Sequence, residues 1–161
     1  MRFAYRLTGT GWAVATLGDD QREIEMVASY LHDSLEQVAR AVLALWEGRA
    51  ESFAIFMDEP GEHRVLFRRQ GDEAVAIEVR WHHDWASWGL SPEDQYESVF
   101  AFASTLTKLR GEILSALKRV WDEHGPRGYE EKWVKHPFPI DAYAKLRCAK
   151  AAIRSVPPPL S

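Results

Sequence analysis

The segment from Trp81 to Gly89 holds the densest set of side chains that could do chemistry. It reads WHHDWASWG and places three tryptophans, two histidines and a carboxylate at the end of an expected strand. Imidazole and carboxylate groups bind transition metals and act as general acids or bases. One hypothesis is therefore a metal-dependent hydrolytic enzyme centred on His82, His83 and Asp84.

The spacing within this segment opposes a metal site. Successive residues of a strand point to opposite faces, so His82 and His83 converge only if the strand breaks between them. A third ligand would have to approach across the sheet, from Asp58, Glu59 or His63. Nothing in the sequence requires that approach, so we predict neither a metal nor catalytic residues here.

Other catalytic and cofactor signatures do not appear in the sequence. There is no Gly-x-Ser-x-Gly nucleophile elbow and no phosphate-binding loop. The glycines at Gly9 and Gly11 precede an expected strand, where a nucleotide site needs a helix. The lone Cys148 lies in a basic helical stretch without a nearby histidine, and we expect it to be a packed residue. We therefore predict no cofactor.

The remaining hypothesis is that these side chains bind another protein. Tryptophan and arginine bury large areas in protein interfaces at small entropic cost. We expect Trp81 to continue the core face of its strand. Trp85 and Trp88 follow in a loop, where they either contact a partner or fold back as a lid over a sheet edge. The predicted partner-binding residues, on the open sheet face and in this loop, are Arg64, Arg68, Glu78, Arg80, His82, Trp85 and Trp88.

Composition and charge restrict the class of partner. The 161 residues include 20 Lys and Arg against 24 Asp and Glu, a net charge of −4 that is too low in positive charge for a nucleic-acid binder. The longest apolar run, Ala41 to Trp46, is far shorter than a membrane span, and no secretion signal is visible. A single cysteine cannot form a disulfide within the chain, so the sequence does not require an oxidising compartment. We expect a cytoplasmic protein that binds neither nucleic acid nor membranes.

Hydrophobic periodicity predicts an α+β fold, with one domain over residues 1–155 and a flexible proline-rich tail over residues 156–161. Asp33 can cap a first helix, Glu36 completes a capping box, and Gly48 provides a left-handed stop. We expect an antiparallel sheet of about six strands, with two main helices packed on one face and a short C-terminal helix. Extended segments are predicted within residues 3–7, 12–18, 24–28, 53–57, 65–69 and 74–81.

The segment from Ser91 to His124 has the signals of one helix, but such a helix would reach about 50 Å, longer than a globule of this size. We therefore divide it into a strand over residues 96–103 and a helix that runs to about His124. Ser104 or Thr105 can cap this helix. Past Pro126 we expect an irregular, aromatic-rich loop pinned onto the core.

Several short motifs resemble a group of small, mostly uncharacterised bacterial proteins, and they extend over nearly the whole chain. Some proteins of this group are similar to immunity proteins of toxin–immunity systems, which block a toxin by binding it. The resemblance implies an α+β fold and brings no catalytic residues. We expect a protein-binding module, with an immunity-type inhibitor of a toxin as its specific form; a homodimer through a sheet edge or the aromatic loop is a further hypothesis. The matching motifs are GWA at 11–13, SYLHDSL at 29–35, EPGE at 59–62, Tyr129, Trp133 and PFP at 137–139.

Overall fold

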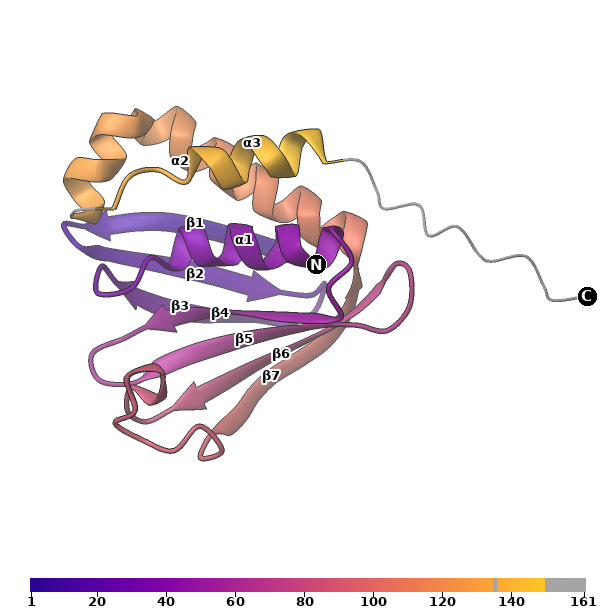
Figure 1. Cartoon of the computed structure of the whole chain (residues 1–161). Helices are drawn as coiled ribbons and strands as arrows, with labels where there is room; N and C mark the ends of the chain where they lie inside the picture. Colours follow the sequence, from indigo (N-terminus) through magenta and orange to yellow (C-terminus); the bar gives the residue numbers. More distant parts are fainter. Residues whose placement is uncertain (135, 150–161) are drawn as a thin grey trace, which may run out of the picture.

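The computed structural model describes residues 1–134 and 136–149, and the described residues form seven strands and three α-helices. The expected tail over residues 156–161 lies outside this range. Figure 1 shows the elements, which follow one another as β1 (Arg2–Gly9), β2 (Trp12–Gly18), β3 (Glu23–Ser29), α1 (Ser34–Trp46), β4 (Glu51–Met57), β5 (Glu62–Arg69), β6 (Ala74–His82), the short 3₁₀ helix η1 (Ala86–Trp88), β7 (Glu97–Thr105), α2 (Leu106–Trp133) and α3 (Ile140–Cys148).

The strands form two antiparallel sheets, ordered β1-β2-β3 and β4-β5-β6-β7. The α+β class is confirmed, whereas the prediction of one sheet of about six strands is wrong. The reason lies at the edge of β4, where α1 takes the place of a neighbouring strand. The side-chain oxygen of Gln37 accepts from the backbone N–H of Ile55 at 2.6 Å. The hydroxyl of Ser52 donates to the carbonyl of Ala41 at 2.9 Å.

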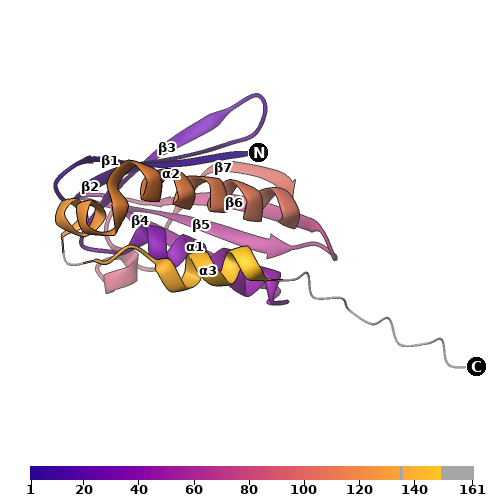
Figure 2. The ribbon, with the colours of Figure 1, turned by 90° about the horizontal axis from the view of Figure 1, so that it is seen from above.

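All three helices lie on one side of the two sheets (Figure 1, Figure 2). α1 packs on β4, and α2 packs on β1 and β7. A single core cluster joins both sheets to the helices and includes Leu35 of α1, Phe67 of β5, Ile77 of β6 and Leu117 of α2. The face of β4–β7 that carries Phe67 and Ile77 is called the inner face below. The opposite face, which α1 borders only along β4, is called the outer face.

The predicted cap at Asp33 and stop at Gly48 are confirmed, whereas the Glu36 side chain pairs with Arg40 and does not complete a capping box. The Asp33 side chain accepts from the backbone N–H of Glu36 at 3.4 Å, and Gly48 beyond the end of α1 has a φ of 106°. The division of the segment from 91 to 124 is also confirmed, because β7 ends at Thr105, whose side chain caps α2 by accepting from the N–H of Lys108.

The chain from Pro126 to Trp133 differs from the prediction, whereas residues 136–139 are irregular as expected and bury Phe138 in the core. Instead of an irregular loop, residues 126–133 form a second arm of α2, after a kink at Gly125 with φ 62° and ψ 175°. Proline suits the first turn of a helical arm because its fixed φ is helical and its missing N–H would have no partner there. Tyr129 and Trp133 of this arm are fully buried. Cys148 at the end of α3 is exposed, so the expectation of a packed cysteine is wrong.

Candidate functional site

The connection between β6 and β7, residues 83–96 and called the tryptophan loop here, folds back onto the outer face. The indole N–H of Trp85 donates to the carbonyl of Asp58 at 2.7 Å. The backbone N–H of Ser87 donates to the carboxylate of Glu62 at 3.1 Å, and its hydroxyl donates to the same group. The loop therefore lies on the side of the four-stranded sheet opposite to the helices, as Figure 1 shows.

Two polar side chains of the outer face, Glu62 and His82, are completely buried beneath this loop. The guanidinium of Arg64 lies 3.5 Å from the Glu62 carboxylate. The His82 ring packs against Tyr96, with ring centroids 5.8 Å apart. Burial first, and the positive charge of Arg64 second, lower the pKa of His82 and so favour its neutral imidazole. A partner has no access to His82 while the loop is closed.

Arg80 and Glu78 continue the polar row across β6. The Arg80 guanidinium lies over the ring of Tyr96, 4.0 Å from its centroid, and donates to Glu78 at 2.8 Å. This hydrogen bond lowers the pKa of Glu78. Arg68 reaches the same carboxylate at 3.3 Å from β5. Arg68, Glu78 and Arg80, which were predicted for the open sheet face, therefore lie close together, but they pair with one another.

The residues predicted to bind a partner thus divide by exposure. Trp88 is 51% exposed and the side chain of Arg68 is 44% exposed, so both can meet a partner. The side chains of Arg64, Glu78 and Arg80 are only 12%, 22% and 18% exposed. Trp85 is half-buried, and its indole holds the loop to the sheet.

Trp81 does not sit in the core as expected. It follows Val79 on the inner face, but at the end of the sheet, where it is only half-buried. Its ring packs on His63 of β5, with centroids 4.6 Å apart. Burial lowers the pKa of His63 to about 4, against the opposing effect of the Asp58 carboxylate. These rings close one end of the core.

The residues of the metal hypothesis do not converge. His82 is buried under the loop, whereas His83 is exposed and lies 2.9 Å from Glu97. His83 and Asp84 line a hollow of about 340 Å³. Within residues 1–134 and 136–149, no group of three or more His, Cys, Asp and Glu side chains could hold a metal ion. No observation therefore favours the metal-dependent enzyme.

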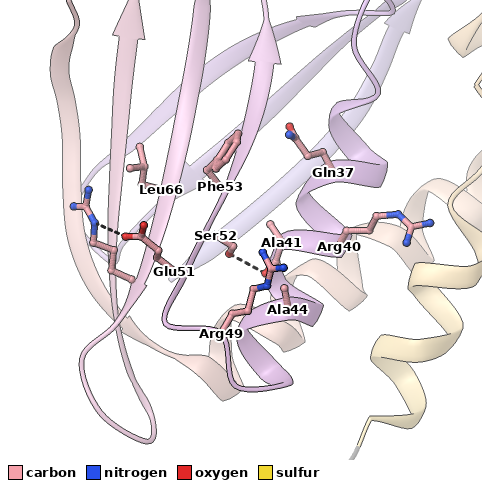
Figure 3. A pocket seen from close by; sticks show the side chains of 10 residues that line it. Gln37, Arg40, Ala41, Ala44, Arg49, Glu51, Ser52, Phe53 and Leu66 are labelled. Carbon is pink, nitrogen blue, oxygen red and sulfur yellow. Dashed lines mark hydrogen bonds and ion pairs between the residues drawn. The ribbon is translucent and has the colours of Figure 1, made fainter. Parts of the chain in front are cut away.

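A larger hollow than that beside His83 lies between α1 and the outer face of β4 and β5 (Figure 3). It measures about 520 Å³ and is called the groove below. The alternation of residues 53–57 could have indicated that Phe53 faces outward, but the groove also needs α1, whose position no sequence pattern fixed. Its lining comprises Gln37, Arg40, Ala41, Ala44, Arg49, Glu51, Ser52, Phe53, Leu66 and Arg68.

In comparisons with protein-family models, with curated proteins and with solved structures, nothing matches this chain. The described helices include none with the length and apolar character needed to cross a membrane. The function must therefore be argued from the chemistry of the outer face, the tryptophan loop and the groove.

Proposed function

We propose that this chain is a cytoplasmic protein-binding module that acts by occupying a surface of its partner, without making or breaking a bond. The observation that carries the proposal is the exposure of large apolar side chains on the outer face and in the tryptophan loop. Phe53 on the outer face is 45% exposed, and Trp88 and Leu90 in the tryptophan loop are 51% and 59% exposed. Side chains of this size, set among arginines, are typical anchors of protein interfaces.

The rigidity of the surface also supports binding. In the tryptophan loop, Trp85 donates to Asp58 in the β4–β5 connection, and Ser87 donates twice to Glu62 of β5. Trp88 packs edge-on against Trp85, with ring centroids 4.8 Å apart. A surface that is ordered before binding loses less conformational entropy when a partner arrives.

The specific form of this proposal is an immunity-type inhibitor of a bacterial toxin. It rests on the motif resemblance, and the three arginines that line the groove offer charged contacts to a partner. In this form the partner is an enzyme whose active site the outer face covers. A second copy of this chain would be the competing partner.

Site-specific photo-crosslinking in the source organism tests the proposal. A benzophenone amino acid replaces Trp88 in one variant and Phe53 in another, and exposed Glu130 on α2 serves as the control position. We expect both test positions, but not the control, to form a covalent adduct with the same protein. The absence of an adduct, or equal adducts from all three positions, would contradict a binding surface on this side.

The identity of the adduct then separates the forms of the proposal. An immunity-type inhibitor predicts a protein that stops growth when produced alone and is neutralised when this chain is produced with it. An adduct with a second copy of this chain would indicate a homodimer and not an immunity-type inhibitor. The purified partner and this chain should then form a complex, and light scattering gives its stoichiometry.

A further inference from the structure

The groove between α1 and β4–β5 is not used by the tryptophan loop and has an unusual charge. Its lining holds three arginines and one glutamate, whereas the whole chain has a net charge of −4. Arg40 pairs with Glu36 on α1, so Arg49 and Arg68 supply the positive charge available to a ligand. A concave surface with this excess of positive charge attracts anionic groups. Its volume of about 520 Å³ lies within the range of sites that bind a small ligand or a few residues of a peptide.

The backbone of Arg49 is held beside the groove by the end of α1. Gly48, with a φ of 106°, reverses the chain, and the backbone N–H of Arg49 donates to the carbonyl of Ala44 at 2.9 Å. Figure 3 shows the Arg49 side chain beside Ala41 and Ala44. Among residues 1–134 and 136–149, no side chain or carbonyl pairs with its guanidinium. A free positive charge therefore stands next to an apolar floor.

Arg68 provides positive charge on the β5 side. It lies 3.6 Å from Glu51 and 3.3 Å from Glu78, and its side chain is 44% exposed. Ion pairs this exposed contribute only about 0–1 kcal/mol. An incoming carboxylate can therefore replace Glu51 as a partner of Arg68 at little cost.

The floor of the groove is apolar and already formed. Phe53 and Leu66 are cross-strand partners on the outer face, and the small side chains of Ala41 and Ala44 leave room above them. The edge N–H of Ile55 is already bonded to α1, so a partner cannot pair with that group as an added strand. Recognition here depends on side chains.

We infer that the groove binds a segment of the partner protein in which a bulky apolar side chain is flanked by carboxylates. The apolar side chain packs on Phe53 and Leu66, and the carboxylates pair with Arg49 and Arg68. Guanidinium and carboxylate groups form strong two-point hydrogen bonds, which fix the segment along the groove. This inference rests on the proposed function and adds the chemistry of the partner segment to it.

Fluorescence anisotropy with labelled peptide pools tests the inference on the full chain. The first pool mixes phenylalanine and leucine with aspartate and glutamate. The second has lysine in place of the acids, and the third keeps the acids but has serine in place of the apolar residues. We expect binding of the first pool only. Lack of binding of the first pool, or equal binding of the third, would overturn the inference, because charge alone would then suffice.

Matched variants locate the binding. Arg49→Glu should weaken binding of the first pool by at least about tenfold and allow binding of the lysine pool. Phe53→Thr, which keeps a strand-forming residue, should also weaken binding of the first pool. Arg127→Glu makes the same change of charge at an exposed position of α2 and should have no effect. Equal affinities for the Arg49 and Arg127 variants would place the binding elsewhere.

Two readouts keep this inference separate from the proposed function. Thermal unfolding should give the same Tm for the Arg49 and Arg127 variants, since both positions are exposed. If photo-crosslinking identifies a partner whose affinity Arg49→Glu leaves unchanged, the binding module stands and the groove is not its docking site. If photo-crosslinking captures no partner but the first pool binds, the inference about the groove is supported and the proposed function is not.

Discussion

The backbone N–H and the hydroxyl of Ser87 both donate to the carboxylate of Glu62, which is completely buried. This contact joins the middle of the tryptophan loop to the first residue of β5, 25 positions earlier in the chain. Arg64 balances the charge of the same carboxylate from 3.5 Å. The shape of the proposed binding surface therefore depends on a residue that no partner touches.

Replacing Glu62 by glutamine should destabilise the protein and loosen the tryptophan loop. The amide keeps the size of the side chain but removes the charge that faces the largely buried Arg64 and weakens both bonds from Ser87. Breaking a buried charge pair in this way costs about 3 kcal/mol. Urea unfolding measures the loss, and limited proteolysis between residues 83 and 96 reports the loop.

Glu93→Gln is the matched control, since Glu93 also lies 3.5 Å from Arg64 but is 71% exposed. Its free energy of unfolding should change by less than about 0.5 kcal/mol. A similar loss for both variants would show that the buried position of Glu62 has no special role.

The two loop tryptophans should respond differently to the same substitution. Trp85→Phe keeps a ring but leaves the carbonyl of Asp58 without its 2.7 Å donor, which should cost about 1–2 kcal/mol. Trp88→Phe at a half-exposed position should change stability by less than about 0.5 kcal/mol. Thermal unfolding compares them. Equal losses of stability would mean that Trp85 does not hold the loop in place. Trp85 would then again be a candidate partner contact.

Gly61, between β4 and β5, should not tolerate a side chain. Its φ is 94°, and an added Cβ would lie 2.4 Å from the Cη2 atom of Trp81 and 2.7 Å from the carbonyl of His82. Gly61→Ala should therefore cost on the order of 2–3 kcal/mol in urea unfolding. Gly71→Ala pays backbone strain alone, since nothing lies within 4 Å of its Cβ, and should cost about 1 kcal/mol. Equal losses would exclude the clash as the cause.

The sequence predicted most elements of this fold because their signals are local. Asp33 and Gly48, which flank α1, mark its two ends through local signals. The arrangement of the sheets could not be predicted in the same way. β3 does not pair with β4, and the N–H of Ile55 in β4 bonds to Gln37 of α1, a contact between residues 18 positions apart that no periodicity encodes.

In the candidate site, too, contacts between distant segments could not be predicted from the sequence. Alternation along β6 correctly places His82 on the face opposite to Trp81, but it cannot show that the tryptophan loop returns to cover His82. The sequence therefore predicted an exposed histidine where the structure has a buried one. Arg49 and Phe53 were missed for a related reason, since they form a groove only after α1 has packed beside β4.

The buried His63 should make the protein less stable in mild acid. Its pKa is about 4 in the folded chain, against about 6.5 in the unfolded chain, so protonation favours unfolding. The stability contributed by its neutral form is complete above pH 6.5 and is lost as the pH falls towards 4, by up to ~3 kcal/mol. In urea unfolding from pH 7.5 to 5, His63→Gln should lose less stability than the wild type as the pH falls. His83→Gln, at an exposed position, should keep the wild-type dependence, and parallel curves for all three proteins would exclude His63 as the group responsible.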